Sequence, residues 1–164
     1  MVLGRVPVVV YRRDWRYLRV LLEGVRAMAV VDQAILAHTE TMKLSSAELA
    51  RQLVQHLGPT VVAVAAGVRD KKLPYKWSAD GGPVPRDGAL QRLQVAHRAW
   101  VAIATSEGAD VARAWFIGAN PRLDEQPPFL AIAAGKFKPV MSAAAAFVDG
   151  TDNFATRYLV NDAA

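Results

Sequence analysis

The sequence predicts an all-α protein with at most one short strand. Apolar residues recur at steps of three and four through most of the chain, which is the spacing of one face of a helix. Glycines and prolines separate these runs in the order that ends one helix and starts the next. After residue 12, almost no segment alternates between apolar and polar residues as a half-buried strand does.

The first 40 residues form a predicted N-terminal extension, in which a short strand over residues 6–11 precedes a long helix. The apolar positions of this helix step by three and four: Trp15, Leu18, Leu22, Val25 and Ala29. Charged residues, most of them arginines, occupy its other faces. A helix of this length either serves as a dimerisation arm or packs on the main core, and the sequence leaves both possibilities open.

A capping box predicts where the next helix begins. Ser45 and Glu48 are spaced so that each side chain bonds the backbone N–H of the other residue. The apolar face of this helix is formed by Leu49, Leu53, Val54 and Leu57. Gly58 ends the helix and Pro59 starts a short apolar helix over residues 60–66, because glycine favours helix ends and proline favours helix starts.

Two more helices are predicted before residue 105. Gly67 ends the helix before it, and Pro74 starts a short helix or turn over residues 75–78. The glycine- and proline-rich run 80–85 is a loop. A longer helix spans residues 90–104, and its inward face is expected to be formed by Leu90, Leu93, His97, Trp100 and Ala104.

A third unit, residues 105–150, repeats this alternation of helix starts and stops. The signals are, in order, Ser106, Gly118, Pro127, Gly135, Pro139 and Gly150. Ser106 is expected to cap a helix over residues 107–117, and the later signals bound two more helices after a turn at Asn120-Pro121. The tail, residues 151–164, keeps apolar side chains that are unusual for a solvated tail.

Composition excludes several kinds of chemistry. The chain has 164 residues, of which 52% are apolar, enough for one compact domain or two small helical units. It has no cysteine, and therefore no disulfide, thiolate metal site or cysteine nucleophile. His38, His56 and His97 are scattered without metal-ligand spacing, and His97 lies on an apolar face, which is typical of a packed histidine. Since no phosphate-binding glycine loop or nucleophile elbow is present, neither an enzyme nor a cofactor is expected.

Hydropathy and charge indicate the expected location of the protein and the kind of partner it binds. No apolar run approaches the roughly 18 uncharged residues of a spanning helix, and no signal peptide is recognised, so a soluble, cytoplasmic protein is expected. The net charge is +5. Residues 41–100 carry nine basic and four acidic side chains, whereas residues 101–164 carry five and seven. This asymmetry indicates an anionic partner for the middle of the chain and a different partner for the last third.

The middle of the chain contains a candidate helix-turn-helix for binding double-stranded DNA. Ala63 provides a small residue in the first helix, and Gly67 provides a residue that accepts positive φ at the turn. The residues predicted to bind DNA are Arg69 at the turn and, facing outward on the second helix, Lys71, Lys72, Tyr75 and Lys76. Trp77 of that helix is expected to face inward. Cationic side chains neutralise phosphates, and lysine or tyrosine reaches base edges. The alternative is an ordinary helix hairpin with a solvated basic surface, and Pro74 limits the second helix to about two turns.

A more specific pattern lies at residues 112–135. An Ala-Arg-x-Trp helix ends at Gly118, Asn120-Pro121 turns the chain, and Leu123 follows. A proline-led apolar helix then ends at Gly135, an alanine-rich helix comes next, and far upstream Trp77 precedes glycines and a proline. Over about residues 44–150 this pattern resembles the MbcA/ParS/Xre antitoxin family. The chain has the residues Asp-Glu-Gln at 124–126, where the family pattern usually carries a glycine.

The resemblance implies an antitoxin of a type II toxin–antitoxin system. Such a protein binds and neutralises a RES-domain toxin that consumes NAD, and it binds operator DNA to regulate its own expression. Residues 44–104 would then form an Xre-like DNA-binding region and residues 105–150 a toxin-binding domain, in a homo-oligomer. The expected partner-binding residues are Trp115, Asn120, Pro121, Arg122, Phe154 and Tyr158. For Trp115, a role in the core is the alternative.

Two other classes of function stay open. The first is a stand-alone helix-turn-helix transcriptional regulator or phage-type repressor without a toxin partner. The second is an interaction module that does not bind DNA. A neighbouring gene for a RES-domain protein distinguishes the antitoxin from the regulator, and salt-dependent retention on DNA distinguishes both from the interaction module.

Overall fold

The computed structural model describes residues 15–150, and at positions 15–19, 26, 27, 30 and 33 it describes the backbone alone. The strand predicted over residues 6–11 lies outside this range, as do Phe154 and Tyr158 of the tail. Within the range the protein is all-α, as predicted, and the pairing of Asn120 with Gln126 is an isolated bridge rather than a strand.

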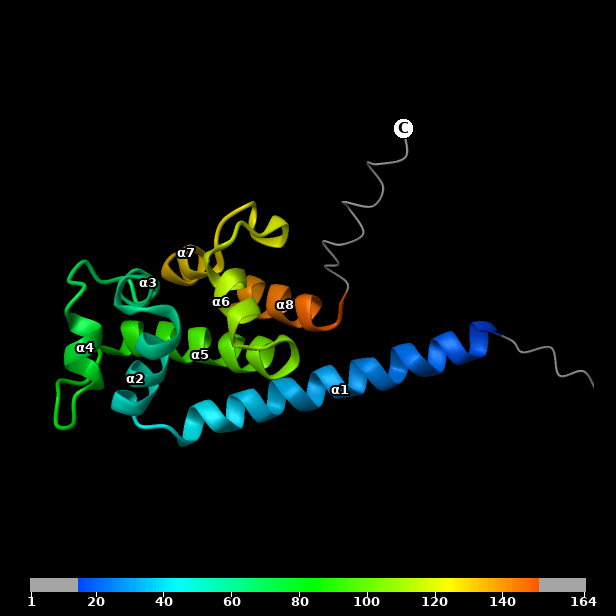
Figure 1. Ribbon diagram of the computed structural model, residues 1–164, viewed down its shortest axis with the longest axis horizontal. Helices are drawn as coiled ribbons and strands as arrows, with labels where there is room; N and C mark the ends of the chain where they lie inside the picture. The colour runs from blue at the N-terminus through cyan, green and yellow to red at the C-terminus, as the bar shows by residue number, and fades with distance from the viewer. Residues whose placement is uncertain (1–14, 151–164) are drawn as a thin grey trace, which may run out of the picture.

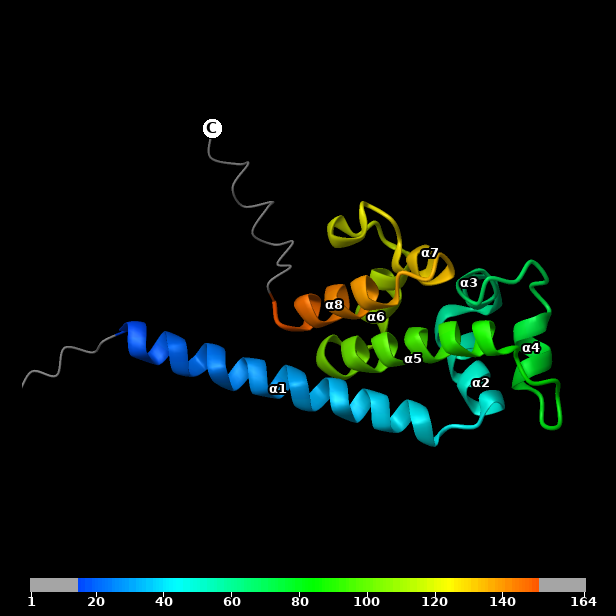
Figure 2. The same cartoon turned by 180° about the vertical axis from the view of Figure 1, so that it is seen from behind.

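Helix α5 lies at the centre of the bundle (Figures 1 and 2). The elements are, in order, α1 Trp15–Lys43, α2 Ser46–Leu57, α3 Pro59–Ala65, α4 Leu73–Ser78, α5 Asp87–Glu107, α6 Ala109–Ile117, the 3-10 helix η1 Pro121–Leu123, α7 Pro128–Ala133 and α8 Phe137–Val148. Helices α2, α3 and α4 gather at one end of α5, whereas α6, α7 and α8 lie along one side of it. Helix α1 runs along another side, and its N-terminal part extends beyond the other helices.

Helix α5 is buried on most of its circumference, which is typical of a helix at the centre of a bundle. Its buried residues are Ala89, Leu93, Val95, Ala96, His97, Ala99, Trp100, Ala102 and Ile103. The predicted inward residues Leu93, His97 and Trp100 are among them. The sequence pattern predicted that one face of this helix is buried, whereas several faces are. The extra buried positions are mainly alanines, whose small side chains let neighbouring helices approach closely.

The hydrophobic core is continuous across residues 104 and 105, where the predicted DNA-binding and toxin-binding regions meet. Leu49 and Leu53 from α2 belong to the same buried cluster as Phe116, Ile132 and Val140 from the last third. Helix α3 packs on α7, and α5 contacts elements of both regions. The two regions are therefore stabilised by one core.

Helix boundaries in the middle of the chain follow the sequence signals. Ser45 and Glu48 form the capping box as predicted, and α2 begins immediately after Ser45. Gly67 ends α3 with φ 75°, and the N–H groups of Gly67 and Val68 bond the carbonyls of Val64 and Ala63. These two bonds form a Schellman motif, which places its glycine in the left-handed region.

Two predicted helix starts are wrong. Ser106 does not cap a helix: α5 continues to Glu107, and α6 begins at Ala109. The break falls at Gly108, whose φ of 92° is accessible to glycine and whose N–H bonds the Ala104 carbonyl. Helix α8 begins at Phe137, so Pro139 lies inside the first turn. Proline is tolerated there because N–H groups of the first turn make no hydrogen bond within the helix.

Helix α1 does not present the predicted apolar face to the core. Leu22, Val25 and Ala29 are exposed, whereas the buried residues of α1 are Ala37 and Thr41. These two lie in the part of α1 that packs on α5. The apolar pattern of the N-terminal part correctly predicted a helix. The apolar face of this part, however, is exposed, and no described residue covers it.

A buried histidine joins α1, α2 and α5. His97 is 2% exposed, its Nδ1 lies 2.7 Å from Thr41 Oγ1, and its Nε2 lies 2.8 Å from Gln52 Oε1. Burial lowers the pKa of His97, and the charge of His56 lowers it further, while Glu40 opposes them. In the neutral ring, Nε2–H donates to Gln52, and Nδ1 and the Ala37 carbonyl, 2.8 Å from Thr41 Oγ1, share the one hydrogen of the Thr41 hydroxyl. His97 is therefore a packed, hydrogen-bonded histidine, as the sequence indicated.

We predict that Thr41→Val lowers the free energy of unfolding by about 1–3 kcal/mol, because it leaves the buried Nδ1 of His97 without a donor. Urea unfolding followed by circular dichroism measures this loss. Thr39→Val is the matched control, since Thr39 lies on the same helix but is exposed, and it is expected to change stability by less than about 0.5 kcal/mol. Equal effects of the two variants would contradict the role of the Thr41–His97 contact.

The lowered pKa of His97 predicts a loss of stability in mild acid. Below the ordinary histidine pKa of about 6.5, the unfolded state binds a proton that the folded state excludes. Stability is therefore complete above this pH and falls as the pH drops toward the folded pKa. Thermal unfolding from pH 7.5 to 5.5 should show a smaller decrease in Tm for His97→Gln than for the unaltered chain. Parallel decreases would assign the pH dependence to other groups.

Candidate functional site

The five residues predicted to bind DNA form one exposed group, which we name the basic surface: Arg69, Lys71, Lys72, Tyr75 and Lys76. Trp77 is buried, as predicted, and anchors α4 in the core. Lys71 and Lys72, however, precede α4 instead of lying on it. The helix begins late because Pro74 is tolerated only in a first turn.

An acidic residue orders the segment that carries the basic surface. Asp70 Oδ1 accepts the backbone N–H of Lys72 at 2.9 Å, and Asp70 Oδ2 lies 3.8 Å from Lys76 Nζ. Aspartate forms such local bonds readily and thereby fixes turns. The basic surface has four cations against this one carboxylate, so it stays strongly positive. Asp70 was not recognised from the sequence, although its position before a proline-led helix was a turn signal.

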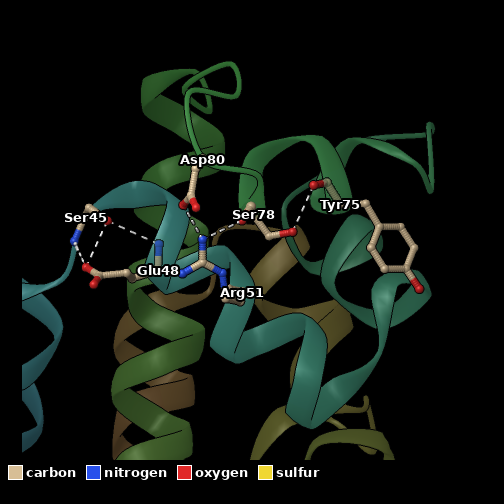
Figure 3. A network of polar contacts seen from close by, with 6 residues as sticks. All are labelled: Ser45, Glu48, Arg51, Tyr75, Ser78 and Asp80. Atoms are coloured by element: carbon tan, nitrogen blue, oxygen red, sulfur yellow. Dashed lines mark hydrogen bonds and ion pairs between the residues drawn. The ribbon is translucent and has the colours of Figure 1, made fainter.

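Arg51 holds α4 against α2 (Figure 3). Its Nη2 donates to the Ser78 carbonyl at 2.9 Å and to Asp80 Oδ1 at 2.7 Å, at the end of α4. On the preceding turn, hydrogen bonds from the backbone and side chain of Ser45 lower the pKa of Glu48. The Tyr75 ring points away from this network, and only the Tyr75 carbonyl takes part in it by accepting the Ser78 hydroxyl at 2.9 Å. The contacts thus position α4 without occupying the side chains that were predicted to bind DNA.

The loop after α4 requires glycine at one position. A Cβ on Gly82 would lie 2.1 Å from the Lys76 carbonyl oxygen and 2.9 Å from the Ala79 carbonyl oxygen, both of them backbone atoms. Gly82 N–H bonds that Ala79 carbonyl at 3.0 Å, so the loop folds back onto the end of α4. The glycine of the Trp-Gly-Pro stretch therefore has a packing role.

The predicted partner-binding residues divide into buried and exposed members. Trp115 is 7% exposed and packs on Phe116 and Phe147, with ring centroids 5.2 and 6.4 Å away. Asn120 is also buried. Pro121 and Arg122 are exposed, and Ile117, which the sequence analysis did not select, is 52% exposed at the end of α6. Helical spacing was the available signal, since Ile117 falls off the face that buries Ala112, Trp115 and Phe116.

Asn120 builds the corner that presents Pro121 and Arg122. Its Oδ1 accepts the Arg122 N–H at 2.9 Å, and its backbone carbonyl accepts the N–H groups of Leu123 and Glu125. A buried side chain therefore shapes the turn, while the two residues after it face outward. We name this region, Ile117–Arg122, the corner surface.

Two consecutive left-handed residues close the loop after the corner. Asp124 has φ 58° and Glu125 has φ 60°, values that cost energy for residues with a Cβ. Lys136 Nζ ties the loop to the start of α8 through Asp124 Oδ2 at 3.2 Å and Gln126 Oε1 at 3.3 Å. Glycine would adopt this conformation without penalty.

No protein-family model, no curated protein and no solved structure matches this chain. Among the described residues, no three histidine, aspartate or glutamate side chains gather as metal ligands. A search of the described part of the chain for a helix of bilayer-spanning length and hydropathy finds none. The two surfaces are thus characterised by their geometry and chemistry alone.

We predict that Glu125→Gly raises the free energy of unfolding by about 0.5–1 kcal/mol, because relief of the left-handed backbone outweighs the entropy that glycine adds to the unfolded chain. Denaturant unfolding measures the change. Asp124→Gly is the matched control: it relieves the same backbone strain but removes the contact with Lys136, so its gain should be smaller. Destabilisation by Glu125→Gly would show that the side chain, and not the backbone, decides stability at this position.

Proposed function

We propose that the protein is the antitoxin of a type II toxin–antitoxin system in the cytoplasm. It neutralises a RES-domain, NAD-consuming toxin and binds operator DNA to regulate its own expression. The observation that carries this proposal is the presence of two separate exposed surfaces on one core: a cationic one on α4 and the segment before it, and an Asn-Pro corner after α6.

The basic surface supports the DNA-binding half of the proposal. Helices α3 and α4 with residues 66–72 between them would act as the helix-turn-helix, with the left-handed Gly67 after the buried Ala63. The cations have few competing partners, since the Lys76 contact with Asp70 is long and exposed. Exposed ion pairs of this kind contribute little energy, so a phosphate can replace the carboxylate.

The corner surface supports the toxin-binding half. Ile117 at the end of α6 and Pro121 and Arg122 in the turn after it are exposed, and Trp115 on the same helix is fixed by two aromatic neighbours. An apolar anchor next to arginine on a rigid support is a common composition for a protein-binding surface. Trp115 and Asn120 contribute by shaping this surface, because both are buried.

An exposed apolar stripe on α1 supports a homo-oligomer. We name it the α1 seam: Leu21, Met28, Ile35 and Met42 follow one another at seven-residue spacing, with Val31 between them. All five are 53–72% exposed. This spacing is that of one position in a coiled-coil heptad, and the seam lies away from Ala37 and Thr41, which face the core. A second copy of α1 would cover the seam.

A stand-alone regulator or phage-type repressor is the second candidate, because the basic surface and the α1 seam need no toxin partner. Co-expression of the chain with a RES-domain protein, if its neighbouring genes encode one, tests the antitoxin directly. The antitoxin should co-purify with that protein and restore the growth of cells that express it. Failure of both, with DNA binding retained, would favour the regulator.

We predict that the two functions can be removed separately. Replacing both Lys72 and Lys76 with Ala should weaken binding to all duplex sequences and reduce the slope of log K against log salt by about 1.8, or about 0.9 for each lost phosphate contact. Arg122→Glu should instead abolish capture of the RES-domain protein. Fluorescence anisotropy at several salt concentrations measures the first effect, and a pull-down measures the second.

Each variant of this pair serves as the control for the other. The double lysine variant should still capture the toxin, and Arg122→Glu should still bind DNA. Lys138→Ala, an exposed lysine on α8, should change neither. Unchanged DNA binding after loss of both lysines would remove the basic surface from the proposal.

We predict that replacing both Met28 and Ile35 with Glu converts the oligomer into a monomer, because it places like charges at the centre of the α1 seam. Light scattering coupled to size exclusion measures the mass. The matched control replaces Leu22 and Leu36 with Glu: both are 62% exposed on the same helix but lie outside the seam, so this variant should remain oligomeric. A monomeric unaltered chain, or dissociation by both variants, would contradict pairing through the seam.

A further inference from the structure

A cavity of about 610 Å³ opens between the connection after α3, the loop before α5 and the N-terminus of α5. Its volume lies in the range of small-molecule sites, about 300–1,000 Å³. Two arginines, Arg86 and Arg92, line it, and no acidic residue does. The cavity therefore has a net positive lining at one end of the bundle.

Arg92 lines this cavity with a positive charge that has no ion-pair partner among the described residues. Its Nε is buried and has no hydrogen-bond partner, and its Nη1 donates to the Gly88 carbonyl at 3.2 Å. No described carboxylate lies within ion-pair distance of it. The Arg92 side chain as a whole is only partly buried, so the guanidinium is open to the cavity. An anion in the cavity would give the buried Nε–H an acceptor and could accept two parallel N–H bonds from the guanidinium.

The start of α5 adds to the positive potential. Arg86 at the N-cap gives no side-chain cap to the helix, and Gly88 and Ala89 of its first turn line the cavity. The backbone N–H groups of a first turn have no helical acceptor, and together with the helix dipole they favour an anion. Asp87 is exposed and is not part of the lining.

The remaining wall of the cavity is apolar. Trp77, Leu73 and Val84 are among the apolar residues that line it, and Val84 is 69% exposed. An inorganic ion would leave this wall in contact with water. An anionic head joined to a flat apolar body fits both halves of the lining.

We propose that this cavity binds a small aromatic carboxylate, with the carboxylate on Arg92 and Arg86 and the ring against Trp77. The proposal is independent of the antitoxin function. It has a consequence for the basic surface, because the Arg92 guanidinium lies against Gly67, 3.4 Å from the position of a Cβ there. A ligand on Arg92 would contact the segment that leads to Arg69 and Lys71.

Titration calorimetry of the full chain with 2-naphthoate tests the proposal, with uncharged 2-naphthamide as the matched ligand. We expect naphthoate to bind at least tenfold more tightly than the amide. Arg92→Met should weaken naphthoate binding at least tenfold, and Arg92→Lys should weaken it less because it keeps the charge. Equal binding of acid and amide, or no binding of naphthoate, would overturn the proposal.

Arg98→Met is the matched control variant. Arg98 also lies on α5 with a buried, unpartnered Nε, but it lines a separate cavity of about 160 Å³ among alanines and should not affect naphthoate binding. If Arg92→Met fails to fold, as shown by circular dichroism, Arg86→Met provides the same test from the exposed arginine. An Arg92→Met variant that binds naphthoate normally but loses affinity for duplex DNA would assign the cavity to a DNA phosphate and overturn the small-molecule proposal.

Discussion

The burial of α5 on several faces is the constraint from which the rest of the structure follows. Alanines at positions such as Ala96 and Ala99 let three groups of helices approach the same axis, while Leu93, Trp100 and Ile103 fill the spaces between them. Because α1, α2 and α8 all pack on this one helix, the basic surface and the corner surface are held at fixed positions by a common support. Neither surface depends on a flexible linker for its placement.

Polar contacts fix the positions of backbone segments that the apolar core alone does not determine. Arg51 fixes the end of α4, Asn120 shapes the corner, and His97 attaches α1. Each of these side chains bonds a neighbouring helix or a backbone group. Buried or partly buried polar groups therefore position the backbone, whereas exposed cations and apolar residues are accessible to partners.

Much of the fold was predictable because helix boundaries are local. The capping box at Ser45 and the glycines at 58, 67 and 135 predicted helix ends that the structure confirms. For α1 the sequence predicted a helix but left open what its apolar face contacts, because periodicity shows that a helix is amphipathic without showing which element covers it. The roles of Gly82 and Arg92 also could not be derived, since they depend on how the loop after α4 folds back and on what surrounds α5. Asp70 differs, because its bond to the Lys72 N–H is local and its position was a turn signal.

The continuous core has a consequence for how such a protein can change over evolution. Leu49 and Phe116 belong to one buried cluster, so a cut between residues 104 and 105 would leave apolar surface in water on both fragments. Recombination at that point would therefore produce two pieces that each lack some of their packing partners. The two surfaces must be inherited as a pair, and one can diverge only by substitutions that leave the shared interior intact.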